Sequence, residues 1–401
     1  MQHTFTIFTL MHLPSYVKSL PLEDLPTFWS PSEFQLLLGT TLAPAVSSKL
    51  KSLRREYDRL CSSAAHTRWY GIVKDHLDFD DWLQVDSMYR SRALDFPQIG
   101  HCMVPGVDLA NHAGGEETVA IYEKDVNGDA VLLLRVGKSL AKDGEVTITY
   151  GDEKGACEML FSYGFLDDKM QSAETLFLSL SLSDDDHAAE AKMKAADCAP
   201  GFKIIDTAGD DIDWTGDFIW LICVNFDDGL RFELARTTEG EEEVQAFYND
   251  SELTGGAAQL RELLAETEMW DVYRLRAIAV LQQRVFDQLQ VLYRTQDDFE
   301  DVAHGEGTDV RDAPHGNAMK LRRFEFQLMN KAYEWFEKEV SLAIFPRVSS
   351  SCCRYDSKDV MDQEFHDLDH TAPGSPRHPS ISTCTLHACG LSGDLIAFAQ
   401  R

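Results

Sequence analysis

The chain has 401 residues, enough to bury a substantial core and to divide into two or three domains. Its 37 basic and 67 acidic side chains give a net charge of −30, which argues against a nucleic-acid-binding surface. The 44% hydrophobic content excludes global disorder, and nine scattered cysteines do not make a disulfide scaffold.

The same quantities bear on location and partners. An odd cysteine count is typical of reduced thiols, and we find no secretory leader and no apolar run of ~20 residues. We therefore expect a cytoplasmic or nuclear monomer that binds neither membranes nor nucleic acid. The negative charge fits a basic protein partner, although it also fits simple solubility.

The first part of the chain is expected to be helical and the next part to be a small β-unit. From Leu22 to about Phe96 the apolar spacing is helical, and Ser30-Pro31 marks a helix start. In residues 99–150, two apolar runs flank Asn127-Gly128, which predicts a β-hairpin. A further strand is expected to end at Tyr150.

A short helix follows this strand and is expected to end at Gly164, since glycine accepts the left-handed conformation at a helix C-terminus. Residues 183–216 are rich in Asp, Ala and Gly and are expected to be a weakly structured connector. Helical spacing returns over 260–294 and 321–340, with a polar loop near 297–318 between them. Beyond Pro346 we expect a disordered tail.

Three common site signatures are incomplete. Gly137-Lys138-Ser139 resembles the end of a phosphate-binding loop, but position 132 is Leu where that motif needs Gly. The cysteines and histidines of the tail lack the paired spacing of a zinc site, and there is no GxSxG nucleophile motif. We therefore expect neither a metal ion nor a nucleophilic serine.

The informative segments are MVPGVDLANHAG, at 103–114, and ITYGDEKGACEMLFSYGF, at 148–165. Together they resemble the SET-domain protein-lysine methyltransferases, in the branch of the Rubisco large-subunit methyltransferase. The matching residues are Pro105, Asp108, Asn111, His112, Gly144, Glu145, Tyr150, Gly151, Tyr163, Gly164 and Phe165.

The resemblance implies an α+β fold, with a SET-type β-fold, a helical insert and a mainly helical C-terminal substrate-binding domain. The implied parts are a remnant of the N-terminal SET region (1–20), the helical insert (21–98), the C-terminal SET core (99–168), a linker (169–216), the helical substrate-binding domain (217–345) and the tail (346–401).

The resemblance also implies transfer of a methyl group from S-adenosyl-L-methionine to a lysine of a basic protein, by analogy a ribosomal protein. Tyr150 would be the catalytic phenol, while Tyr163 and Phe165 would line the substrate channel with it. Arg92, Asn111, His112 and Tyr163 would bind the cofactor, the Arg92 guanidinium pairing with its carboxylate. For His112, Arg92 and Tyr163, ordinary structural roles remain the alternative.

The chain departs from the family at its start. Family members carry a Gly-x-Gly turn that contacts the cofactor, but this chain has no Gly before Gly39. Either the N-terminal strands of a longer enzyme are missing, with residues 3–10 as a residual strand, or this is a shortened relative. In the second case we expect a catalytically inactive protein-binding module. A histidine acceptor in place of lysine also stays open.

Overall fold

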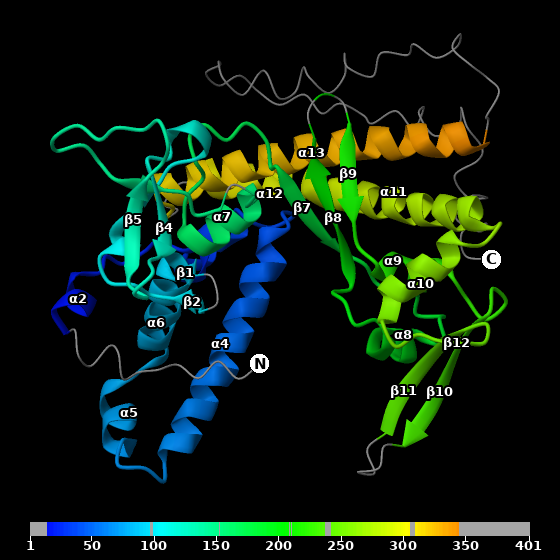
Figure 1. The fold of residues 1–401 in the computed structure, drawn as a ribbon, viewed down its shortest axis with the longest axis horizontal. Helices are drawn as coiled ribbons and strands as arrows, with labels where there is room; N and C mark the ends of the chain where they lie inside the picture. Colours follow the sequence, from blue (N-terminus) through cyan, green and yellow to red (C-terminus); the bar gives the residue numbers. More distant parts are fainter. Residues whose placement is uncertain are drawn as a thin grey trace. The chain divides into compact units, whose positions relative to one another are not determined.

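The structure is a computed structural model that describes residues 14–96, 99–151, 153–207, 209, 211–236, 242–304 and 309–344. The strand expected at 3–10 and the tail expected at 346–401 lie outside these residues. The chain divides into two units, coloured along the sequence in Figure 1. Unit 1 is Met1–Ala189, Cys198–Ile219 and Arg284–Glu334, and unit 2 is Glu190–Asp197, Trp220–Gln283 and Trp335–Arg401.

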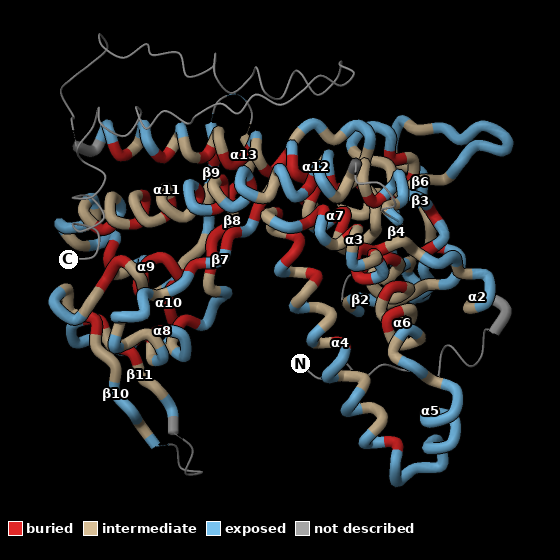
Figure 2. The backbone as a smooth tube through the Cα atoms, turned by 180° about the vertical axis from the view of Figure 1, so that it is seen from behind, coloured by how far each residue is buried: buried red, intermediate tan, exposed pale blue. Residues whose placement is uncertain are grey.

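Unit 1 begins with the predicted helices. They are α2 (Pro14–Ser19), η1 (Pro26–Phe28), α3 (Pro31–Gln35), α4 (Leu42–Ala64), α5 (Tyr70–His76) and α6 (Phe79–Arg92). The helix start at Ser30 is confirmed, because Ser30 and Glu33 form a reciprocal capping box. Helix α5 has no buried residue and is coloured mostly as exposed in Figure 2. The end of the predicted helical stretch differs, since β1 (Leu94–Phe96) is a strand.

Short strands form the β-unit that follows. They are β1, β2 (Gly100–Cys102), β3 (Asn111–His112), β4 (Ala120–Lys124), β5 (Ala130–Leu134) and β6 (Thr147–Ile148). The hairpin around Asn127-Gly128 is confirmed, with β4 antiparallel to β5. The strand expected to end at Tyr150 is shorter than predicted, because β6 has only two residues and pairs in parallel with β3. Tyr150 and Val146 still pack against the core cluster of Leu94, Phe96, Val107, Ala110, Ala120 and Ile148.

The helix after β6 is α7 (Ala156–Tyr163), and it ends as predicted. Gly164 has φ 80°, the left-handed conformation that a side chain makes costly. A Cβ atom there would also lie 2.8 Å from the carbonyl oxygen of Asp24. Glycine therefore both terminates α7 and permits a close backbone contact.

The connector expected at 183–216, and the wider linker at 169–216, are structured instead. Strands β7 (Thr175–Ser179), β8 (Gly201–Asp206) and β9 (Ile212–Thr215) form an antiparallel sheet in the order β7-β8-β9. The glycines that suggested a loop allow close strand contact: a Cβ atom on Gly216 would lie 2.6 Å from the Gly201 carbonyl oxygen. The Asp, Ala and Gly content of this segment therefore led to the prediction of a connector in place of strands.

Unit 2 combines helices with a second sheet that the helical expectation for 217–345 missed. Its elements include most of α8 (Ala189–Ala195), part of α9 (Phe218–Cys223), β10 (Leu230–Arg236), β11 (Glu242–Tyr248), β12 (Ser251–Glu252), α10 (Gly256–Ala265) and the first part of α11 (Trp270–Arg294). The strands form an antiparallel meander in the order β10-β11-β12. Within this unit Arg276 on α11 forms an ion pair with Asp228, at 2.9 Å.

The end of α11 and the first part of α13 (Asp312–Ile344) return to unit 1. The polar loop expected near 297–318 is wrong in part, because α12 (Gln296–His304) occupies 296–304. Arg322 on α13 donates a hydrogen bond to the Leu292 carbonyl at 2.9 Å, which ties α13 to α11. Within the described ranges no helix combines the length and apolarity needed to cross a membrane.

Glu325 gives unit 1 a buried titrating group. Its carboxylate accepts hydrogen bonds from the amide and the hydroxyl of Thr41. Burial raises the pKa of Glu325 from 4.5 to about 7, against the opposing effects of Thr41 and the Arg322 charge. The folded protein therefore holds this proton more tightly than the unfolded chain.

Substitution of this carboxyl is expected to change how stability depends on pH. The contribution of Glu325 is complete below pH 4.5 and is lost progressively as the pH rises to about 7, because over this range the unfolded chain ionises freely whereas the buried carboxyl keeps its proton. In Glu325→Gln this pH-dependent decrease in the free energy of unfolding, on the order of 1–3 kcal/mol, should be absent. Urea unfolding at several pH values measures it, and Glu334→Gln, at an exposed position of the same helix, should keep the wild-type profile.

Candidate functional site

Four of the predicted site residues form a cluster of rings in unit 1. The ring centroids of Tyr150 and Tyr163 are 4.6 Å apart and tilted by 35°. The His112 ring lies 5.2 Å from Tyr150 and 6.1 Å from Phe165. Phe165 in turn lies 6.4 Å from Tyr163. The structure therefore brings together residues that are up to 53 positions apart in the sequence.

The backbone of two neighbouring segments fixes this cluster. In the β3–β6 pair Asn111 lies opposite Thr147 and His112 opposite Ile148. Just beyond the pair, the amide of Tyr150 donates a hydrogen bond to Nδ1 of His112 at 3.1 Å. The Tyr150 hydroxyl donates to the carbonyl of Ala110 at 2.9 Å. Residues 110–112 thus hold Tyr150 both at its backbone amide and at its hydroxyl.

Tyr163 is joined to the same segment from α7. Its hydroxyl donates to the backbone carbonyl of Tyr150 at 3.3 Å. Burial raises the pKa of Tyr150 to about 12, an effect that the charge of Arg92 opposes and that of Glu23 reinforces. Burial also raises the pKa of Tyr163, while Lys154 opposes that shift. Both phenols are therefore protonated at neutral pH and can donate hydrogen bonds.

Arg92 lies beside the segment that precedes β3 and holds two protein groups. Its Nη1 donates to the Asp108 carbonyl at 3.0 Å, and its Nη2 pairs with the carboxylate of Glu23. Among the described residues its Nε is buried without a hydrogen-bond partner. Tyr16 of α2 donates to the carboxylate of Asp108, whose pKa is raised by burial. Arg92 thus lies near Tyr150 but does not belong to the ring cluster.

Asn111 is the predicted site residue whose side chain is directed elsewhere. It is exposed, and its Nδ2 donates to Oε1 of Glu145 at 2.6 Å. Its neighbour His112 contacts the rings, as alternation along a strand requires. The role of Asn111 in cofactor binding remains a prediction.

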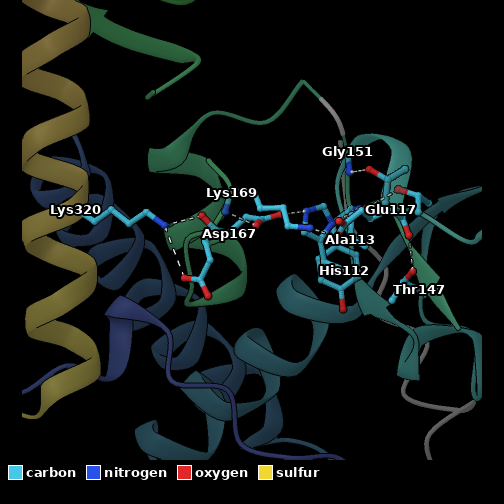
Figure 3. A network of polar contacts seen from close by, with 12 residues as sticks. His112, Ala113, Glu117, Thr147, Gly151, Asp167, Lys169 and Lys320 are labelled. Atoms are coloured by element: carbon cyan, nitrogen blue, oxygen red, sulfur yellow. Dashed lines mark hydrogen bonds and ion pairs between the residues drawn. The ribbon is translucent and has the colours of Figure 1, made fainter. Parts of the chain in front are cut away.

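Two residues that the sequence did not single out connect this cluster to α13. Asp167 places its carboxylate 3.7 Å from Nε2 of His112, and its backbone carbonyl accepts a hydrogen bond from Lys320 at 2.6 Å. Figure 3 shows Lys320, Asp167 and His112 in this order across the site. Asp167 stands two residues after Phe165 and could have been considered. Lys320 carries no sequence signal for the site, since only tertiary structure brings α13 here.

An open pocket of about 530 Å³ adjoins the cluster. It is lined by Gly151, Glu153, Lys154, Glu158 and Lys203. Gly151 follows Tyr150 directly, and Lys154 reaches the face of Tyr163, so the pocket opens beside the two phenols. Within the part of the chain that the structure describes, no group of three or more His, Cys, Asp or Glu side chains is arranged to hold a metal ion.

Comparisons with known proteins bear on the family resemblance and the fold. No protein-family profile matches the chain. The chain is 26% identical over 274 residues to SET domain-containing protein 8 of Schizosaccharomyces pombe. This match covers 67% of the chain and 60% of that protein, so the chain matches less than two thirds of the length of its curated relative.

Solved structures of the Rubisco methyltransferase LSMT share the fold. The LSMT SET domain bound to lysine and AdoHcy superimposes with a TM-score of 0.59 at 18% identity, over 88% of this chain and 78% of that one. LSMT bound to AdoMet gives a TM-score of 0.55 at 16% identity over the same shares. These findings confirm the predicted α+β fold of SET type and the resemblance on which it was based.

The hydrogen bond between Tyr163 and the Tyr150 carbonyl should contribute measurably to stability. Tyr163→Phe removes the donor and keeps the ring, so we expect the free energy of unfolding to fall by about 0.5–1.5 kcal/mol. Chemical denaturation measures the change. Tyr70→Phe, at an exposed position on α5, is the matched control and should be neutral. Equal stabilities of the two variants would contradict a role for the Tyr163 hydroxyl in holding the site together.

Proposed function

We propose that this chain is an S-adenosylmethionine-dependent protein-lysine N-methyltransferase, or the major part of one. The observation that carries the proposal is the Tyr150–Tyr163 ring pair, held against His112 in a chain with a SET-type fold. Methyl transfer to an amine is a displacement at carbon, so it needs an aligned acceptor in a narrow site more than it needs acid–base groups. Two packed phenols fixed by backbone hydrogen bonds meet that need.

The residues beside the ring pair fit S-adenosylmethionine. Arg92 already holds one carboxylate, that of Glu23, and its buried Nε has a hydrogen-bonding capacity that the described residues leave unused. A guanidinium suits a carboxylate with two oxygens, so Arg92 would hold the amino-acid end of the cofactor after Glu23 is displaced. Asn111 and His112 would contribute to the same site. When bound, the cofactor supplies a methyl group on a sulfonium.

The chain's own phenols would orient and stabilise the acceptor lysine. Because burial keeps Tyr150 protonated at neutral pH, its hydroxyl donates to the Ala110 carbonyl and its oxygen can accept a hydrogen bond from the acceptor amine. The faces of Tyr150 and Tyr163 attract a sulfonium or an entering ammonium, and the ammonium must lose its proton to solvent before it accepts the methyl group. Phe165 extends the ring cluster beside His112. The protein thereby contributes position and electrostatics rather than a covalent intermediate.

The substrate would be a basic protein. A net charge of −30 attracts a lysine-rich chain over distances beyond direct contact, which raises the rate of encounter. Abundant basic proteins such as ribosomal proteins fit this description. We propose that the chain meets them as a cytoplasmic or nuclear monomer, with unit 2 as the part that grips the substrate.

A catalytically inactive SET-like binding module is the alternative. The specific observation in its favour is the Glu23–Arg92 ion pair, because a protein carboxylate already satisfies the group assigned to the cofactor. In that case basic proteins would bind to the chain, but no methyl group would be transferred. The two functions differ in two measurable properties, affinity for S-adenosylmethionine and transfer of its methyl group.

Calorimetry and methyl transfer separate these functions. We expect the purified chain to bind S-adenosylmethionine and to transfer labelled methyl groups to lysines in a mixture of ribosomal proteins. Tyr150→Phe should lower the turnover number on the order of 100-fold, because loss of the hydroxyl misplaces the acceptor. Tyr70→Phe should leave it unchanged. A folded chain that binds basic protein but neither binds the cofactor nor transfers methyl groups would establish the inactive module.

A further inference from the structure

Lys154 lies at the open pocket beside the ring pair, in the turn between β6 and α7. Its alkyl chain folds back over Gly151: a Cβ atom on Gly151 would lie 2.8 Å from Cε and 3.2 Å from Cγ of Lys154. Gly151 has φ 130°, so a side chain at this position would also strain the backbone. The Lys154 side chain therefore lies directly against the backbone of Gly151.

The ammonium of Lys154 is held by two groups. Its Nζ lies 5.8 Å from the centroid of the Tyr163 ring. It also forms an ion pair with Oε1 of Glu158 at 2.7 Å. An aromatic face together with a carboxylate is a favourable environment for a lysine ammonium. Gly151, Tyr163 and Glu158 thus form a lysine-binding surface, and the chain's own lysine occupies it.

We infer that Lys154 is an internal occupant of the site through which the substrate lysine enters. This inference rests on the proposed function and adds to it that the substrate must displace Lys154 from Tyr163 and Glu158. The displaced position then accepts a lysine side chain of the substrate. The requirement selects protein segments rich in lysine, which can replace one ammonium by another without leaving Glu158 unpaired.

Lys154 is suited to occupy the site rather than to react in it. Although burial opposes the shift, the hydrogen bond to Glu158 raises the pKa of Lys154. Methyl transfer needs a neutral amine with a free electron pair, and an ammonium paired with a carboxylate has none. The substrate amine escapes this restraint only if it passes beyond Glu158 towards Tyr150. Lys154 is tethered two residues before Ala156, the first residue of α7.

Lys203 provides a matched control in the same pocket. It lines the pocket from β8, and Lys203→Met removes the same charge as Lys154→Met. A general gain in affinity from a more negative pocket would appear equally in both variants. A gain from removing the occupant would appear only in Lys154→Met.

The experiment is a titration of the purified full chain with Nα-acetyl-lysine amide, without cofactor, followed by NMR of labelled tyrosine rings. We expect Lys154→Met to bind this probe about 3- to 10-fold more tightly than Lys203→Met does, with the Tyr163 ring signal perturbed. In methyl-transfer assays Lys154→Met should lower KM for the protein substrate. Equal affinities in the two variants would overturn the inference.

Two further measurements keep the inference separate from the proposed function. If Lys154→Met does not fold, as judged by thermal unfolding, Lys154→Gln is tested with the same expectation. Methylation of Lys154 itself, detected by mass spectrometry after incubation with S-adenosylmethionine, would overturn its assignment as a non-reacting occupant. A chain that does not bind S-adenosylmethionine would refute the proposed enzyme, whereas the lysine-probe titration would still decide whether Lys154 occupies the site.

Discussion

The hydrogen bond from the Tyr150 amide to Nδ1 of His112 is the contact on which the candidate site depends. The β3–β6 pair has only two residues on each side, so the ladder alone gives few hydrogen bonds to fix its register. A slip of one residue would turn His112 away from the rings. The imidazole acceptor and the Ala110 carbonyl bind only the correct register, and both hold Tyr150. The polar groups that position the phenol therefore also specify the strand pairing.

Much of this arrangement was predictable, and the reason is local. The hairpin at Asn127-Gly128, the helix start at Ser30 and the cap at Gly164 each depend on one or two residues with strong backbone preferences. The ring cluster was predictable because its members come from two motif segments and because rings of this size pack together. The strands at 175–215 were not, since the segment at 183–216, which includes the connections between them, is rich in Asp, Ala and Gly.

The charged side of the site was predictable only in part. Arg92 was singled out, but its partner Glu23 comes from a segment without a recognisable motif, and Asn111 binds Glu145 in place of a group in the site. Partners of long charged side chains depend on tertiary contacts that no periodicity encodes. The same holds for Lys320 and Asp167, which stand 153 positions apart and are joined by one hydrogen bond.

Helix α13, which lies outside the two motif segments, supports the ring cluster. Arg311, just before this helix, binds the buried carboxylate of Glu33 through Nε at 2.7 Å, and although burial opposes it, this contact lowers the pKa of Glu33 to about 2. Its Nη1 binds Asp24, whose carbonyl lies against Gly164, and Asn317 donates to the Gly164 carbonyl at 3.2 Å. Gly164 directly follows Tyr163, so these contacts hold the second phenol in place. The helix is therefore needed by unit 1 for the geometry of its site, and a site assembled from the two motif segments alone would lack this support.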